Sequence, residues 1–120
     1  MAGEESVSAS LIRRSDLPDS GIVALEGDIH GDPGSIVVET LGSEIRAWIN
    51  ACPHQGRRLD YAPGKFLLDG MHLVCAAHGA SFRRSDGRCD AGPCRGESLQ
   101  ALAVEPLPGG FLRIIGFRPR

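Results

Sequence analysis

The sequence predicts an all-β protein, and three observations support this fold class. Glycine (16 residues) and proline (8 residues) make up about a fifth of the 120-residue chain, which favours short strands and tight turns over helices. Short runs rich in Val, Ile and Leu recur at intervals of roughly 8–12 residues, as they do in antiparallel sheets. No segment has the apolar spacing of a long amphipathic helix.

The expected strands are short, and turn residues separate them. In chain order they cover residues 11–13, 22–25, 35–38, 45–49, 71–74, 81–83, 102–105 and 111–115. Turns are expected at 17–21, 31–34 and 41–43, and a hairpin connection at 106–110. The only helical turns that the sequence allows lie near 63–64 or 97–100.

The strand expected at 45–49 has the clearest alternation. Ile45, Ala47 and Ile49 would share one face, and Trp48 would lie on the other, followed by Asn50 on the same side. Trp48 is therefore expected to be a packing residue.

Length and composition limit the type of protein. The chain is expected to form one domain over residues 1–120, with a largely aliphatic core because aromatic residues are only 5% of it. No apolar run approaches the roughly 18 residues that span a bilayer, so no membrane partner is expected. The first ten residues lack the basic and apolar regions of a signal peptide, and we expect a cytoplasmic protein.

Charge is unevenly distributed although the net charge is only −2. Residues 1–45 carry nine acidic residues and two arginines, a net charge of −7, whereas residues 46–95 carry seven arginines, one lysine and four acidic residues, a net charge of +4. No aromatic stacking platform accompanies these basic residues, so no nucleic-acid partner is expected. The basic segment is either an ordinary solvated surface or a docking face for an acidic redox partner.

Two short loops each combine one cysteine with one histidine: Cys52 and His54 in the first loop, Cys75 and His78 in the second. Zinc sites usually group two cysteines and then two histidines, whereas here each loop offers one of each. This grouping suits a two-iron cluster in which one iron takes both thiolates and the other takes both imidazoles, the arrangement of a Rieske [2Fe–2S] centre. A zinc-stabilised structural module is the alternative.

The segment CPHQG … CAAHGASFRRSDGRC … GPC, which begins at Cys52 and ends at Cys94, resembles the Rieske iron–sulfur family. The family motif is C-x-H-x-G, a spacer and C-x-x-H-G, and here Gly56 and Gly79 fill the glycine positions. Gly92-Pro93 matches the loop that covers the cluster. The resemblance implies an antiparallel β-sandwich with a small cluster-binding subdomain, at about residues 48–90, inserted between its strands.

The resemblance also implies a role for each ligand. Cys52 and Cys75 would bind the inner iron as thiolates, and His54 and His78 would bind the outer iron, which changes oxidation state in this family. The two motif glycines are expected to turn the backbone sharply and to direct amide N–H groups toward the cluster sulfides.

Four positions depart from the Rieske subunits of respiratory complexes. Arg57 and Ala76 replace the extra cysteines that form a disulfide between the loops in those subunits. Ala80 and Phe82 replace a serine and a tyrosine whose hydroxyls donate hydrogen bonds to sulfur. Because such bonds raise the potential, their loss predicts the lower part of the Rieske range of about −150 to +300 mV.

These features predict a one-electron carrier with no catalytic residues, not an enzyme. The resemblance implies that it passes electrons from a flavin-containing reductase to a terminal oxygenase or a similar acceptor. Rieske oxygenase α-subunits need a further mononuclear iron domain, for which this chain is too short. Besides the zinc module, the alternative is a non-catalytic small subunit of a larger oxidoreductase such as a nitrite reductase.

The other cysteines and histidines are expected to have no part in the cluster. Cys89 and Cys94 would pack as small apolar groups, and a disulfide between them is an alternative that a reducing cytoplasm opposes. His72 is expected to be a strand residue, and His30 is assigned no role. Four arginines flank the ligand loops and would serve either solubility or partner docking: Arg57, Arg58, Arg83 and Arg84.

Overall fold

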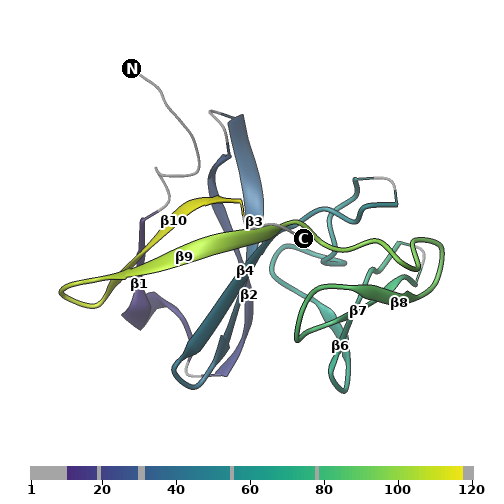
Figure 1. Cartoon of the computed structure of the whole chain (residues 1–120), viewed down its shortest axis with the longest axis horizontal. Coiled ribbons are helices and arrows are strands. Elements are labelled where there is room, and N and C mark those ends of the chain that lie inside the picture. The colour runs from purple at the N-terminus through teal and green to yellow at the C-terminus, as the bar shows by residue number, and fades with distance from the viewer. Residues whose placement is uncertain (1–10, 19, 30–31, 55, 78, 118–120) are drawn as a thin grey trace.

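In the computed structural model, which describes residues 11–18, 20–29, 32–54, 56–77 and 79–117, the chain forms two antiparallel sheets (Figure 1). The larger sheet contains β1 (Leu11–Arg13), β2 (Ser20–Ile29), β3 (Asp32–Leu41), β4 (Glu44–Ile49), β9 (Ala101–Leu107) and β10 (Phe111–Phe117). The smaller contains β5 (Leu67–Asp69), β6 (His72–Val74), β7 (Ser81–Arg83) and β8 (Cys89–Ala91). Within the described residues the strand orders are β1-β10-β9-β4-β3-β2 and β5-β6-β7-β8.

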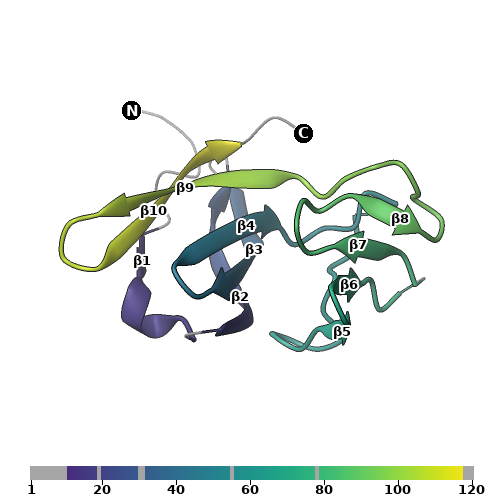
Figure 2. The ribbon, with the colours of Figure 1, turned by 60° about the horizontal axis from the view of Figure 1, so that its bottom comes forward.

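The larger sheet is strongly twisted, so that β2, β3 and β4 run across the direction of β9 and β10 (Figures 1 and 2). Apolar side chains from both halves of the sheet meet in one cluster, which we call the base core. Its buried members are Ile12, Leu17, Ile36, Val38, Ala47, Leu102, Leu112 and Ile114. Burial of these side chains is the main stabilising contribution to this part of the fold.

β3 and β4 are buried on both faces because the smaller sheet lies against the second face. Ile36, Val38 and Ala47 belong to the base core, whereas their neighbours Val37 and Trp48 belong to a second apolar cluster, which we call the site core. The site core also holds all four cysteines and apolar side chains of the smaller sheet. The alternation expected for residues 45–49 is therefore confirmed, and each face of β4 has its own apolar partner.

The smaller sheet is inserted between β4 and β9, as expected for a cluster-binding subdomain (Figure 2). One buried ion pair connects it to the base. Glu39 of β3 is completely buried, and Arg84, in the turn after β7, donates from Nε to Glu39 Oε2 at 2.7 Å. Arg46 of β4 donates to the backbone carbonyl of Arg84 at 2.8 Å. These contacts hold the β6–β7 hairpin against the larger sheet.

The all-β prediction is confirmed, but several local expectations were wrong. β5 and β8 were not expected, since each has only three residues and a weak apolar pattern. The turn predicted at 31–34 was wrong from Asp32 onward, because Asp32–Gly34 pairs with Gly27–Ile29. β4 pairs with β3 only from Ile36 onward, so Pro33 has a neighbouring strand, β2, on one side only. The missing N–H of Pro33 is tolerated for this reason.

The expected helical turns also differ. Residues 63–64 form a turn closed by a bridge between Ala62 and Lys65, and residues 97–100 are not helical. A 3-10 turn forms instead at Arg14–Asp16. No helix among the described residues has the length and apolar character needed to cross a membrane.

Candidate metal centre

The two ligand loops have the same backbone hydrogen-bonding pattern. In the first, the Cys52 amide donates to the Arg57 carbonyl at 2.7 Å, and the Gly56 amide donates to the Cys52 carbonyl at 2.7 Å. In the second, the Cys75 amide donates to the carbonyl of Ala80 at 2.7 Å, and the amide of the motif glycine donates to the Cys75 carbonyl at 2.9 Å. Loops of equal length are thus closed in the same way at both cysteines.

The motif glycines are required by this geometry. Gly56 has a φ of 72° and Gly79 a φ of 77°, in the left-handed region that disfavours other residues. The sharp turns expected at both glycines are confirmed, and the approach of neighbouring amide N–H groups to the cluster sulfides stays a prediction. Each glycine amide is already used to close its loop on the cysteine carbonyl.

The two candidate thiolates lie side by side inside the molecule. Cys52 is 3% exposed and Cys75 is 1% exposed, and both belong to the site core. Burial raises the pKa of the Cys52 thiol, and the adjacent Cys75 raises it further, whereas an N–H donated from the His54 backbone opposes the shift. His54 itself is exposed at the surface. The fourth candidate, His78, lies outside the described residues.

The loop that contains Gly92 and Pro93 packs tightly against the second ligand loop. A Cβ at Gly92 would lie 2.8 Å from Ala80 Cα, and Gly92 has a φ of 97°, so this position requires glycine. Ala80 and Phe82 are both completely buried. Ala80 and Phe82, which replace the hydroxyl donors of respiratory Rieske subunits, therefore lie in the site core. Neither side chain can donate a hydrogen bond.

Cys89 and Cys94 are free thiols in the structure, and their Sγ atoms are 3.2 Å apart. Both are 1% exposed, and Cys89 Sγ also lies 3.1 Å from the carbonyl oxygen of Ala91. Burial raises the pKa of Cys94 above the usual thiol range, and the neighbouring Cys89 raises it further. Their membership of the site core agrees with the expected packing role.

His72 lies on β6, as expected for a strand residue. Its Nε2 is 2.8 Å from Asp90 Oδ2, and this contact lowers the pKa of the Asp90 carboxyl. His30 lies outside the described residues.

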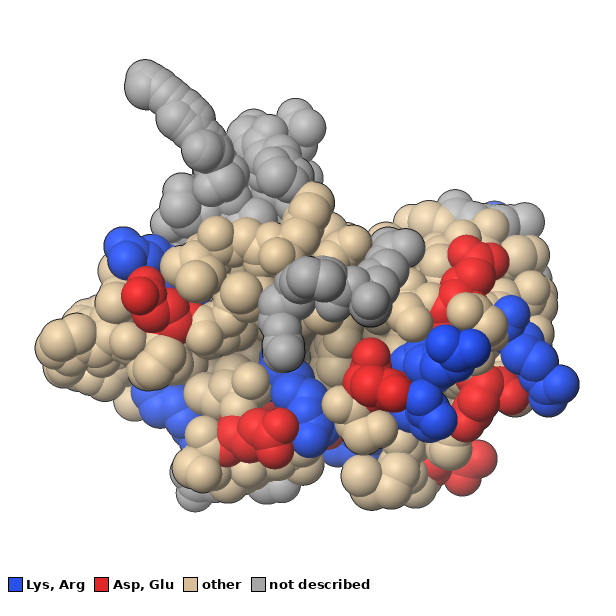
Figure 3. All heavy atoms as spheres, in the orientation of Figure 1, with Lys and Arg blue, Asp and Glu red and all other residues tan. Residues whose placement is uncertain are grey.

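The arginines that flank the loops do not form one free basic face. Arg84 is engaged with buried Glu39, Arg83 pairs with Asp86, and Arg58 pairs with Asp60. Figure 3 shows acidic and basic side chains interspersed over the lobe of the smaller sheet. The docking interpretation is therefore wrong for Arg84, whose side chain is only 15% exposed. Arg57 is exposed and has no ion pair with any described residue.

The grouping of the donors fits a two-iron cluster, because each loop carries one cysteine and one histidine. Among the residues that the structure describes, no three His, Cys, Asp or Glu side chains are placed to hold one ion. A Rieske centre needs only two protein ligands at each iron, and the paired inner thiols provide one such half-site.

A comparison with protein-family models matches residues 10–108 to the Rieske [2Fe-2S] domain. The chain belongs to the Rieske [2Fe-2S] domain family. Its cofactor is accordingly one Rieske-type [2Fe–2S] cluster. The family resemblance inferred from the two loops and the Gly-Pro segment is confirmed.

The chain is similar to known proteins in sequence and in fold. The alpha subunit of methanesulfonate monooxygenase hydroxylase from Methylosulfonomonas methylovora is 28% identical over 64% of this chain, but the chain spans only 22% of that protein. The ferredoxin of carbazole 1,9a-dioxygenase from Nocardioides aromaticivorans IC177 superimposes with a TM-score of 0.65 at 23% identity, over 88% of this chain and 94% of that one.

A chain from the complex of reduced oxygenase and oxidized ferredoxin in carbazole 1,9a-dioxygenase gives a TM-score of 0.67 at 21% identity, with 92% and 97% of the two chains covered. These structures confirm the Rieske-type antiparallel fold.

Sequence reasoning missed the polar residues that support the first ligand loop. Asn50 is 4% exposed, and the Asp60 side chain is 1% exposed, yet neither was singled out. The sequence signal that could have identified Asn50 was its polar side chain on the same strand face as Trp48, two residues before the first ligand.

Proposed function

We propose that the protein is a one-electron carrier whose cluster is held by Cys52 and Cys75 on one iron and by His54 and His78 on the other. When bound, the cluster accepts and releases a single electron. The chain contributes the buried thiolate pair, the two matched loops and a surface position for a histidine. No catalytic residue is assigned, and the protein is not an enzyme in this proposal.

One observation carries this proposal: the thiols are inside and the described imidazole is outside. Cys52 and Cys75 are almost completely buried, whereas His54 is exposed on the same loop as Cys52. A carrier needs this asymmetry, since a partner must come close to the redox-active iron while the other iron stays anchored in the protein.

We propose a terminal oxygenase as the electron acceptor and a flavin-containing reductase as the donor. The support is that the chain matches dioxygenase-system ferredoxins over nearly their full length, and that one such structure is a ferredoxin–oxygenase complex. By contrast, the chain covers only 22% of the longer monooxygenase subunit.

The two alternative functions are not favoured. A nitrite-reductase-like small subunit without a redox role would not need the complete ligand set, and all four ligand residues are present here. A zinc module would usually group two cysteines and then two histidines, whereas here each loop carries one of each.

We further propose that residues 1–120 act as one domain with a cluster-binding subdomain at about 48–90, and that the protein is cytoplasmic. The single connected order of the larger sheet, with β1 paired to β10, supports the first point. Cys89 and Cys94, which lie side by side as free thiols, suit the reducing conditions of the cytoplasm and support the second.

EPR of the reduced protein tests the ligand assignment. The wild type should show the signal of a [2Fe–2S] cluster with mixed histidine and cysteine ligation, and His54→Ala should abolish it. His72→Ala is the matched control, because His72 lies on β6 and pairs with Asp90. Survival of the Rieske signal in His54→Ala, or its loss in His72→Ala, would contradict the assignment. A colourless protein that binds one zinc would reject the redox function.

A further inference from the structure

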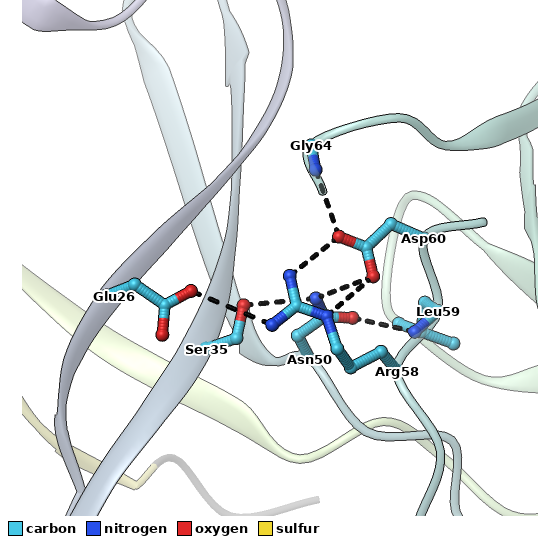
Figure 4. A network of polar contacts seen from close by, with 7 residues as sticks. All are labelled: Glu26, Ser35, Asn50, Arg58, Leu59, Asp60 and Gly64. Atoms are coloured by element: carbon cyan, nitrogen blue, oxygen red, sulfur yellow. Dashed lines mark hydrogen bonds and ion pairs between the residues drawn. The ribbon is translucent and has the colours of Figure 1, made fainter. Parts of the chain in front are cut away.

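Asn50 is a buried amide placed directly before the first ligand loop. It follows β4, is 4% exposed, and uses both ends of its side chain (Figure 4). Its Oδ1 accepts from the Leu59 amide at 2.8 Å, while its Nδ2 donates to Ser35 Oγ at 3.1 Å and to Asp60 Oδ1 at 3.4 Å. Its backbone amide also donates to the Ser35 carbonyl at 3.0 Å. Asn50 therefore joins β3 to the far end of the ligand loop.

Asp60 is the second centre of this network. Its side chain is 1% exposed, and it accepts two hydrogen bonds from Arg58, at 2.9 and 2.8 Å, and one from the Gly64 amide at 3.0 Å. Arg58 in turn lies 3.7 Å from a carboxylate oxygen of Glu26 on β2. These contacts lower the pKa of Asp60 to about 2, mainly through Arg58, so the carboxylate stays charged.

The network closes the base of the first loop and reaches the second. Asn50 lies two residues before Cys52, and its partners Leu59 and Asp60 lie after the loop. The Leu59 carbonyl accepts a hydrogen bond from the amide of Ala76, next to Cys75, at 3.4 Å. Hydrogen bonds thus connect β3 to Asn50, Asn50 to the Leu59 amide, and the Leu59 carbonyl to Ala76 in the second ligand loop.

We propose that Asn50 and Asp60 are positioning residues for the Rieske cluster, which set the first ligand loop relative to the base sheet and to the second loop. This inference rests on the ligand assignment of the proposed function. Neither residue is a ligand. Each acts through the backbone that carries Cys52 and His54. Polar groups around a metal site orient its ligands, and their loss typically weakens metal retention by about 10–100-fold.

The test compares Asn50→Leu with the wild type in the cluster-loaded protein. Leucine keeps the approximate volume but removes every side-chain hydrogen bond of the network at this position. We expect loss of visible absorbance in the presence of a chelator to be about tenfold faster, together with a shifted reduction potential and altered EPR g-values. Asp60→Asn, which keeps the shape but removes the charge that Arg58 binds, should change the same quantities less.

Thr40→Val is the matched control. Thr40 is completely buried on β3, and its hydroxyl donates to the Pro18 carbonyl at 2.8 Å, away from the ligand loops. This variant should lower the unfolding midpoint but leave the potential, EPR spectrum and rate of cluster loss unchanged.

The outcomes separate the two proposals. If Asn50→Leu lowers only the unfolding midpoint, as Thr40→Val does, Asn50 is merely structural and the positioning role is wrong. If Asn50→Leu does not fold, Asp60→Asn decides, and an unchanged potential, g-value set and rate of cluster loss in that variant would overturn the proposal. If the wild type lacks a Rieske signal, the ligand assignment fails, and the positioning role fails with it.

Discussion

Replacing Arg84 with methionine is expected to destabilise the protein by about 3–5 kcal/mol. The substitution leaves the Glu39 carboxylate buried without its partner, at a position that is 0% exposed. Glu39 Oε1 already lacks a hydrogen-bond partner among the described residues, and Glu39 Oε2 accepts from the Arg84 side chain that the substitution removes. The substitution also removes a hydrogen bond from Arg84 to the Gly70 carbonyl, at 3.1 Å.

The double variant Glu39→Leu/Arg84→Met should recover most of this loss. Two apolar side chains avoid the desolvation of a buried charge, and such replacements are often neutral or stabilising by about 1–4 kcal/mol relative to a buried ion pair. The residual loss would reflect the hydrogen bonds that Arg84 makes outside the pair. A double-mutant cycle should therefore show strong coupling between positions 39 and 84.

Urea unfolding followed by circular dichroism measures these free energies. Arg113→Met is the control, because the Arg113–Glu105 pair, at 2.9 Å, is exposed on both sides and should contribute only about 0–1 kcal/mol. If Arg84→Met costs no more than Arg113→Met, or if the double variant is as unstable as the single one, Glu39 and Arg84 do not form a buried pair in solution.

Three further predictions concern the loops and the surface. Asp60 has a pKa of about 2 in the folded protein and an ordinary value of 3.8. Its ionised form should therefore contribute about 2 kcal/mol of stability above pH 4 that is lost as the pH falls toward 2. Asp60→Asn should lack this acid-dependent loss in pH-dependent unfolding, and equal pH profiles would contradict the shift. Gly92→Ala should destabilise the protein by about 1–3 kcal/mol more than Gly110→Ala. Both glycines have a positive φ, but only a Cβ at position 92 would clash, with Ala80. Equal losses of stability in urea unfolding would exclude the close approach of Gly92 to Ala80. Arg57→Glu should slow reduction by the physiological partner at low salt and have little effect at high salt, and a stopped-flow rate that is unchanged at low salt would exclude docking at this side chain.

Local sequence was sufficient for the family and for strands with a strong apolar pattern, whereas the four-residue ligand set stays a prediction. Residues 45–49 alternate, residues 111–115 are a short apolar run interrupted by Arg113, and both segments form strands. By contrast, β5 and β8 have three residues each and are strands only because β6 and β7 lie beside them. The extension of β3 through Pro33 could not be predicted from local sequence either. It depends on this part of β3 being paired with β2 on one side only.

The roles of charged and polar residues were the least predictable. Arg84 and Arg57 look alike in the sequence, as basic residues close to ligand loops, yet one is bound to buried Glu39 and the other is exposed. Asn50 and Asp60 became recognisable only when their partners from β3 and the loop were in place.

The fold class, the family and the chemistry of the donor set follow from the sequence of two short loops and the turns between strands, because these are properties of neighbouring residues. Which side chains are buried, which charges are paired and what holds the first ligand loop depend on segments far apart in the chain. Val37, Trp48 and Phe82, for example, meet only in the site core. Burial and pairing are properties of packing, and only the tertiary contacts between the two sheets decide them.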